Sequence, residues 1–193
     1  MKKVAVLIYD KFCIFEFSVA LEMLAMAKKP ITVFAKSLNP VRSEEGLIVV
    51  AEKTIYELNI GEYDALLLTG SADIREAVED EDILSFIKCF DKNDIIIGAI
   101  SIAPVFLMKL GMLKGKRFMI GIDREGLLEE GFTPLDMELM VDWNDNLKNP
   151  VPEGYIQDGN VITSVSYGFT RWAIAFGRAI GISFNPKSFG LDI

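Results

Sequence analysis

Residues 94–111 read DIIIGAISIAPVFLMKLG, which predicts a strand that runs directly into a helix. The β-branched run before Ser101 is typical of a buried strand, and the apolar run after it is typical of a helix with Pro104 in its first turn. Small residues, Ala99 and Ala103, stand two positions before and after the corner, where a sharp turn leaves little room. The stretch therefore predicts a nucleophile elbow, a strand-turn-helix with Ser101 exposed at its corner.

Strand-like and helix-like segments alternate along the chain, which is typical of an α/β domain with a mainly parallel sheet. Besides the strand that ends at residue 100, strands are expected at 4–9, 31–36, 64–69 and near 117–122, with a pair at 155–157 and 161–165 around an Asp-Gly-Asn turn. Helices are expected at 13–28, 79–91, 103–110 and 169–180, and an edge hairpin within 41–58. No linker or repeat divides the sequence, so we expect a single domain over residues 1–193.

Charge and hydropathy restrict the possible partners. The net charge of -8 argues against nucleic acid and anionic membrane surfaces, whereas small neutral or cationic ligands remain possible. The apolar run at 4–9 is too short for a signal peptide and no run is long enough to span a bilayer, so we expect a cytoplasmic protein. Segment 123–154 carries nine acidic and two basic residues, a difference of seven; its role is open, and a solvated excursion is the simplest interpretation.

Metal and disulfide chemistry find little support in the sequence. The chain has no histidine and only two cysteines, Cys13 and Cys89, so neither a disulfide framework nor a metal or cofactor site of the usual composition is expected. Cys13 is either a nucleophile at a helix start or a packed residue, and Cys89 is interpreted as structural. Residues 144–146 resemble calcium ligands, but no glutamate follows at the required spacing.

Three features fall where parallel strands end, at the edge where α/β proteins form their sites: Ser101, the Gly70-Ser71 pair and Glu16. The amides of Gly70 and Ile102 would form an oxyanion hole, or Gly70 is simply a turn glycine. Glu16 lies in a helix that is apolar almost all round, where a carboxylate is costly unless paired or protonated. It either shares a proton with Ser101, or reaches solvent or caps a backbone amide.

Four segments together resemble the DJ-1/PfpI superfamily: YDKFCIFEF at 9–17, DALLLTG at 64–70, AISIAP at 99–104 with GMLKGK at 111–116, and DGNVITS at 158–164. The resemblance implies a flavodoxin-like three-layer sandwich of the class I glutamine amidotransferase-like type, usually a homodimer. It also implies a cysteine at the elbow, hydrogen-bonded to an acidic residue from the first helix. Ser101 stands at the position of that cysteine and Glu16 at the position of the acid.

The sequence departs from the family pattern around this site. Ile102 and Ala103 stand where many members have histidine or threonine and then glycine, and Gly70-Ser71 replaces a glycine pair. Many members also place a histidine shortly after the strand expected near 117–122, and this chain has none. A thiol ionises near neutral pH, whereas a serine hydroxyl must lose its proton during attack, so the cysteine protease, glyoxalase and deglycase activities of such proteins are not expected here.

Three functional hypotheses remain. In the first, the protein binds a small ligand or a partner at the altered site without cysteine-dependent chemistry. In the alternative, it is a small-molecule hydrolase, hydratase or lyase in which Ser101 is the nucleophile and Glu16 handles the proton. The third is a structural or chaperone-like role through an apolar face of the first helix, formed by Phe15, Phe17 and Met23.

Overall fold

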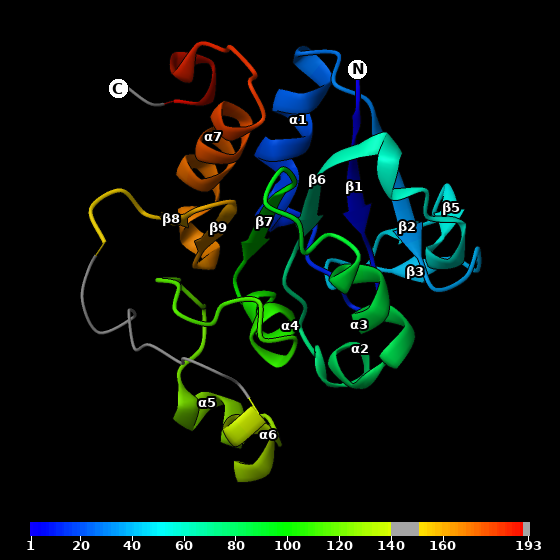
Figure 1. Cartoon of the computed structure of the whole chain (residues 1–193), viewed down its shortest axis with the longest axis vertical. Helices are drawn as coiled ribbons and strands as arrows, with labels where there is room; N and C mark the ends of the chain where they lie inside the picture. The colour runs from blue at the N-terminus through cyan, green and yellow to red at the C-terminus, as the bar shows by residue number, and fades with distance from the viewer. Residues whose placement is uncertain (140–150, 191–193) are drawn as a thin grey trace.

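The computed structural model describes residues 1–139 and 151–190; residues 144–146, which were discounted as calcium ligands, and part of the acidic segment lie outside this range. A seven-stranded sheet with the order β5-β2-β1-β6-β7-β9-β8 forms its centre (Figure 1). All neighbouring strands are parallel except β8 and β9, which are antiparallel. The strands are β1 (Lys3–Leu7), β2 (Ile31–Ala35), β5 (Lys53–Thr54), β6 (Tyr63–Leu68), β7 (Ile96–Ile100), β8 (Ile156–Asp158) and β9 (Val161–Ser164).

Helices cover both faces of this sheet and complete the expected three-layer sandwich. One face packs against α1 (Ser18–Met26) and α7 (Phe169–Ala179), which also contact each other. The other face packs against α2 (Arg75–Glu79), α3 (Glu81–Lys88), α4 (Pro104–Lys109) and α5 (Arg124–Glu129), with α6 (Pro134–Leu139) against α4. Figure 1 shows α1 and α7 side by side, away from α2, α3 and α4.

The alternation of side chains along the central strands explains why the sheet is buried on both faces. On β6, Ala65 and Leu67 belong to the core under α1 and α7, whereas Leu66 and Leu68 belong to the opposite core. Gly98 on β7 allows close packing of α7, because a Cβ at this position would lie 2.8 Å from Phe176 Cδ2. The apolar strand β6 is therefore covered by helices on both faces, and Gly98 gives α7 room to pack closely on β7.

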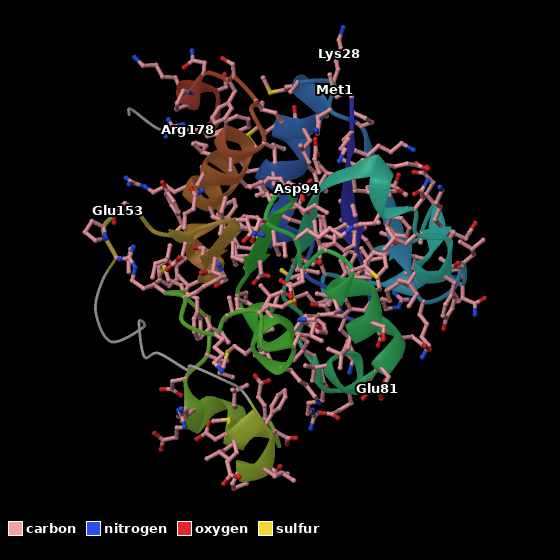
Figure 2. The ribbon with its side chains drawn as sticks, viewed as in Figure 1. Met1, Lys28, Glu81, Asp94, Glu153 and Arg178 are labelled. Atoms are coloured by element: carbon pink, nitrogen blue, oxygen red, sulfur yellow. The ribbon has the colours of Figure 1, made fainter. Side chains whose placement is uncertain are left out.

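The register brings the ends of the central strands together. Leu7 at the end of β1 lies opposite Leu68 of β6, Leu68 lies opposite Ala99 of β7, and Ile100 lies opposite Ser164 of β9. Residues that follow these strands therefore share one edge of the sheet. Figure 2 marks the opposite edge, where Met1 and Asp94 stand just before β1 and β7.

The fold class and most elements were predicted, with four corrections. The helix expected at 13–28 begins with a 3₁₀ turn, η1 (Phe15–Phe17). The helix expected at 79–91 is α3, and it is preceded by a short helix, α2, that was not expected. The strand expected near 117–122 is wrong: the Arg117 and Met119 amides donate to side chains of β8 and β9, Asp158 Oδ2 and Thr163 Oγ1, and not to backbone carbonyls as in a sheet.

The segment expected as an edge hairpin is divided between two sheets. Its first part is the hairpin of β3 (Val41–Arg42) and β4 (Ile48–Val49), whereas β5 joins the edge of the main sheet beside β2. Two further 3₁₀ turns, η2 (Ile55–Glu57) and η3 (Ile60–Glu62), lead into β6. Across residues 1–139 and 151–190, every helix is too short or too polar to cross a membrane.

Candidate functional site at Ser101 and Glu16

Ser101 occupies the corner between β7 and α4 in a left-handed backbone conformation, with φ of 62°. Such a conformation is uncommon for a residue that has a Cβ, and surrounding contacts must hold it. The Ser101 amide donates to the Ser164 carbonyl at 2.8 Å, and the Gly121 amide donates to the Ser101 carbonyl at 2.7 Å. The serine backbone is thus fixed from both sides, with the side chain partly exposed.

Glu16 reaches the same place from η1 and is 5% exposed. Its Oε2 atom accepts a hydrogen bond of 2.7 Å from the Gly70 amide and one of 3.3 Å from Thr69 Oγ1. The interpretation that Glu16 reaches solvent therefore does not hold, whereas the interpretation that it accepts from a backbone amide does. A buried carboxylate with such donors is much less costly than an isolated one.

The Glu16 carboxyl group also interacts with Ser101. Burial raises the pKa of Glu16 above its ordinary value, and hydrogen bonding from the Ser101 hydroxyl and from the Gly70 amide opposes this increase. The negative charge of Glu44 raises the pKa further. The net result is a raised pKa, so this site favours the neutral acid more than water does.

Gly70 brings the backbone of β6 close to both groups. A Cβ built on Gly70 would lie 2.6 Å from Glu16 Oε2 and 2.9 Å from Ser101 Oγ, so a side chain here has no room. The Gly70 amide already donates to Glu16, and its use as an oxyanion donor would require Glu16 to move. The Ile102 amide has no hydrogen-bond partner among the described residues, while the Ile102 side chain is buried in the core. The oxyanion hole stays a prediction, and one of its two donors already has a partner.

Ser71 lies beside this group in a turn, where its hydroxyl contacts the backbone of Asp10 and Asp73. This hydroxyl accepts from the Asp73 amide at 3.1 Å, and its one proton is shared between the Asp73 carbonyl at 3.1 Å and the Asp10 carbonyl at 3.3 Å. A backbone bridge also joins Ser71 to Phe12. Ser71 therefore helps to connect the ends of β1 and β6, and a role in ligand binding stays a prediction.

Sequence reasoning missed three residues that support the site: Thr69, Gly121 and Ser164. The single hydroxyl proton of Thr69 is shared between the Cys13 carbonyl at 2.5 Å and Glu16 Oε2 at 3.3 Å, which ties η1 and the residues before it to the end of β6. A Cβ at Gly121 would lie 3.1 Å from the Ser101 carbonyl carbon, so a glycine permits the close approach. Thr69 could have been identified as a site residue, because it is a polar residue at the end of an apolar strand. Gly121 could not, because it lies in the stretch expected as a strand.

A possible metal-ligand group lies next to the site. Cys13 Sγ and carboxylate oxygens of Glu44 and Glu45 lie within 4.8 Å of one another. Glu45 Oε1 already accepts from the Phe15 amide at 2.9 Å and from Cys13 Sγ at 3.5 Å. Burial and the Glu16 charge raise the pKa of the Cys13 thiol, which therefore stays protonated. These contacts account for the group as a hydrogen-bonded cluster, and the raised thiol pKa argues against Cys13 as a nucleophile.

The comparison with protein families agrees with the fold and with the segments around the site. The family model described as the DJ-1/PfpI family matches residues 2–180. The chain belongs to the DJ-1/PfpI family. Sequence relatives include DJ-1alpha of Drosophila melanogaster, 27% identical over 158 residues, which cover 80% of this chain and 66% of that protein.

Two microbial proteins of unstated activity are also similar. One from Staphylococcus epidermidis is 31% identical over 156 residues, covering 79% of this chain and 90% of its own length. One from Methanocaldococcus jannaschii is 27% identical over 124 residues, covering 64% of this chain and 54% of its own length. The matches thus span about half of the M. jannaschii protein and about two thirds of DJ-1alpha.

Solved structures of DJ-1 proteins have the same fold. The DJ-1 superfamily protein Atu0886 from Agrobacterium tumefaciens matches with a TM-score of 0.76 at 18% identity, covering 98% of this chain and 95% of that chain. Schizosaccharomyces pombe DJ-1 matches with a TM-score of 0.69 at 19% identity, covering 99% of each chain. At such identities the likeness extends to the fold and not to activity.

Because Ser101 has a left-handed backbone conformation, we expect glycine at this position to give a more stable protein than alanine. A residue with a Cβ loses about 1–2 kcal/mol in this conformation, whereas glycine loses roughly 0.5–1 kcal/mol more backbone entropy on folding. Ser101→Gly is therefore expected to raise the free energy of unfolding by about 0.5–1 kcal/mol relative to Ser101→Ala, which keeps the Cβ but lacks the hydroxyl. Urea unfolding of the two variants measures the difference, and a less stable glycine variant would contradict stored strain at this corner.

Proposed function

We propose that this DJ-1/PfpI protein binds a small polar ligand at the Ser101 and Glu16 site and lacks cysteine-dependent catalytic activity. Ser101 stands where the family resemblance places a cysteine, and a hydroxyl does not ionise near neutral pH as a thiol can. Glu16 is a weak base for this hydroxyl, because a carboxylate has a much lower proton affinity than an alkoxide. Serine thus preserves the shape of the site without the reactivity of a thiol.

The observation that carries this proposal is the strained corner itself. Ser101 keeps φ of 62° and faces a carboxyl group that is 5% exposed, although both features lower stability. Backbone strain of this kind persists only where the surrounding structure enforces it, and it is found most often at functional sites. A site retained for a ligand accounts for both features, whereas a purely structural corner could use glycine at position 101.

The donors and acceptors of the site indicate the class of ligand. The Ile102 amide can donate to a carbonyl oxygen, as can the Ser101 hydroxyl once it turns away from Glu16, and Glu16 can then accept from a hydroxyl or amide N–H of the ligand. When Glu16 is ionised, its negative charge disfavours an anion beside it. The proposed ligand is therefore a small neutral molecule with a carbonyl and a hydroxyl or amide group.

Two measurements with the Ser101→Ala variant test the proposal. In turnover assays with glyoxal, glycated amines and peptides, wild type and variant are expected to be equally inactive. In NMR titrations with glycolamide, a neutral carbonyl compound with a hydroxyl group, the wild type is expected to show shifts around Ser101 that weaken in Ser101→Ala. Robust turnover that disappears in Ser101→Ala would contradict the proposal, as would identical titrations of both proteins.

The second candidate function is a serine-dependent hydrolase, hydratase or lyase, and the closeness of the Ser101 hydroxyl to the Glu16 carboxyl, both of which lie against Gly70, favours it. In the hydrolase, the Ser101 oxygen would bond to a carbonyl carbon as the C=O π bond opens and Glu16 takes the hydroxyl proton. Collapse of the adduct would expel the leaving group with that proton, and water would then release the acyl group from Ser101. The Gly70 amide, already bonded to Glu16, weighs against it. A serine-directed covalent probe separates the candidates: labelling of wild type but not Ser101→Ala would support the enzyme.

The homodimer, the cytoplasmic location and the exclusion of nucleic acid and membrane partners stay predictions. The chaperone-like hypothesis has lost its basis in the proposed apolar face. Phe17 and Met23 are buried within the chain, at 4% and 0% exposure. Phe15 is half exposed and its ring packs on Phe169 of α7, with centroids 4.5 Å apart. These three side chains therefore do not form a common exposed surface.

A further inference from the structure

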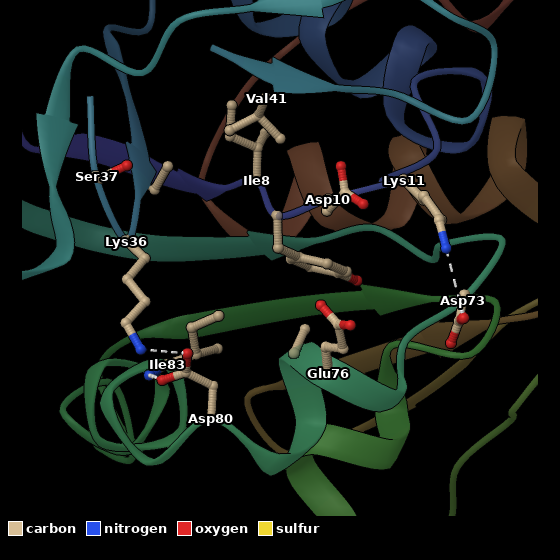
Figure 3. A pocket seen from close by; sticks show the side chains of 13 residues that line it. Ile8, Asp10, Lys11, Lys36, Ser37, Val41, Asp73, Glu76, Asp80 and Ile83 are labelled. Carbon is tan, nitrogen blue, oxygen red and sulfur yellow. Dashed lines mark hydrogen bonds and ion pairs between the residues drawn. The ribbon is translucent and has the colours of Figure 1, made fainter. Parts of the chain in front are cut away.

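A pocket of about 200 Å³ lies beside the Ser101 site, at the same edge of the sheet. Its walls come from the residues that follow β1 and β2, from Val41 of β3, and from α2 and α3 (Figure 3). Ser101, Glu16 and Gly70 do not line it. Pockets for drug-sized ligands are commonly larger, at roughly 300–1,000 Å³, so this pocket suits a smaller molecule.

The cationic side chains at this pocket already have acidic partners. Lys36 Nζ lies 2.5 Å from Asp80 Oδ2, and Lys11 Nζ lies 3.5 Å from Asp73 Oδ2. Figure 3 shows both lysines directed at these partners on opposite sides of the pocket. An anionic ligand would have to compete with carboxylates of this chain, so the lysines do not make an anion site.

Two carboxylates of the pocket have no such partner. Among the described residues, neither Asp10 nor Glu76 forms an ion pair or a side-chain hydrogen bond through its carboxylate. Glu76 points from α2 toward the end of β1, where Asp10 lies (Figure 3). Arg75 attracts Glu76 but forms its ion pair with Asp73. The pocket lining as a whole holds four carboxylates and two lysines, a net charge of -2, which favours a cationic ligand.

The rest of the wall is apolar and well packed. Ile8 and Ile83 line it with exposures of 2% and 4%, together with Ala35, Ala77 and the partly buried Val41. A bare metal ion would leave this surface in water, whereas a short carbon chain would cover it. The combination of two carboxylates and an aliphatic wall fits an organic cation.

We propose that this pocket binds a short aliphatic primary amine. Its ammonium group, which has three N–H donors, would bridge Asp10 and Glu76, and its carbon chain would lie along Ile8, Val41 and Ile83. The site is separate from the one at Ser101 and does not depend on the function proposed there. Tyr9 lies between them: it lines the pocket, and its buried hydroxyl donates to the Thr69 carbonyl.

NMR titration of the folded protein with n-butylamine tests the proposal, with sodium butyrate and n-butanol as probes of equal chain length. Shifts are expected around Asp10 and Glu76 with the amine only. Asp10→Asn and Glu76→Gln are each expected to weaken amine binding about tenfold or more, since each removes one charge-assisted hydrogen bond. Both residues are exposed, which keeps the variants folded. Glu81→Gln removes an exposed charge from neighbouring α3 outside the pocket and is the matched control (Figure 2).

The outcomes are distinct from those for the Ser101 site. Unchanged affinity in Ser101→Ala and Glu81→Gln, with weaker binding in Asp10→Asn and Glu76→Gln, would support the amine pocket. Equal response to butylamine, butyrate and butanol would overturn it, as would the same affinity in all variants. If a pocket variant failed to fold, the comparison of the three probes on wild type would still decide.

Discussion

Gly70→Ala is expected to lower the free energy of unfolding by about 1–3 kcal/mol and to displace the groups at the Ser101 site. The added methyl group would lie 2.6 Å from Glu16 Oε2 and 2.9 Å from both Ser101 Cβ and Oγ. Neither neighbour can retreat easily, because Glu16 is buried and the Ser101 backbone is held by two hydrogen bonds. Urea unfolding measures the loss, and glycolamide binding at the Ser101 site is expected to be lost with it.

Gly61→Ala is the matched control for this variant. Gly61 lies in η3, and a Cβ there would meet only Asn59 Oδ1, at an ordinary contact distance of 3.6 Å. The same chemical change is thus made without a clash, and we expect its effect on stability to be within roughly 0.5 kcal/mol. Equal stability of the two variants would show that the site has room for a side chain at Gly70.

The central part of the fold could be predicted because short stretches of sequence determine its strands and turns. The run before Ser101 is apolar and β-branched, and the Asp158-Gly159-Asn160 turn places a glycine at a position where φ is 60°. The start of α3 is also a local signal: Asp80 caps this helix by accepting from the Asp82 and Ile83 amides, close to the expected start at 79. The preceding helix α2 was missed because its five residues are too few to show a helical periodicity.

The remaining features depend on contacts between residues far apart in the sequence. Residues 117–122 look like a strand, yet their amides find Asp158, Thr163 and Ser101 as acceptors. The proximity of Glu16 to Ser101 was expected from strand order, but the use of the Gly70 amide by Glu16 was not. No local pattern places Asp10 beside Glu76, which come from different elements. Tertiary packing, rather than propensity, decides these features.

Glu16→Gln is expected to remove a decline in stability with rising pH. The pKa of Glu16 in the folded protein is raised, mainly by burial, above a value near 4.3 in the unfolded chain. Between these two pKa values the folded protein binds more protons than the unfolded chain, so the free energy of unfolding falls as pH rises through this interval. Glutamine does not titrate, and its carbonyl oxygen can still accept from the Gly70 amide.

The difference between wild type and Glu16→Gln isolates this group from the other carboxylates. Partial burial of Glu45 acts to raise its pKa, but hydrogen bonds from the Phe15 and neighbouring amides lower it to about 2. Glu45 therefore makes the free energy of unfolding rise with pH, and this contribution is the same in both proteins. Burial and the Glu16 charge raise the pKa values of Tyr9 and Cys13, which therefore stay protonated between about pH 4 and pH 8. Glu22→Gln, an exposed change on α1, controls for the loss of a charge. Urea unfolding across this range should show wild type losing stability relative to Glu16→Gln as pH rises, and parallel curves would mean that Glu16 ionises as freely in the folded protein as in the unfolded chain.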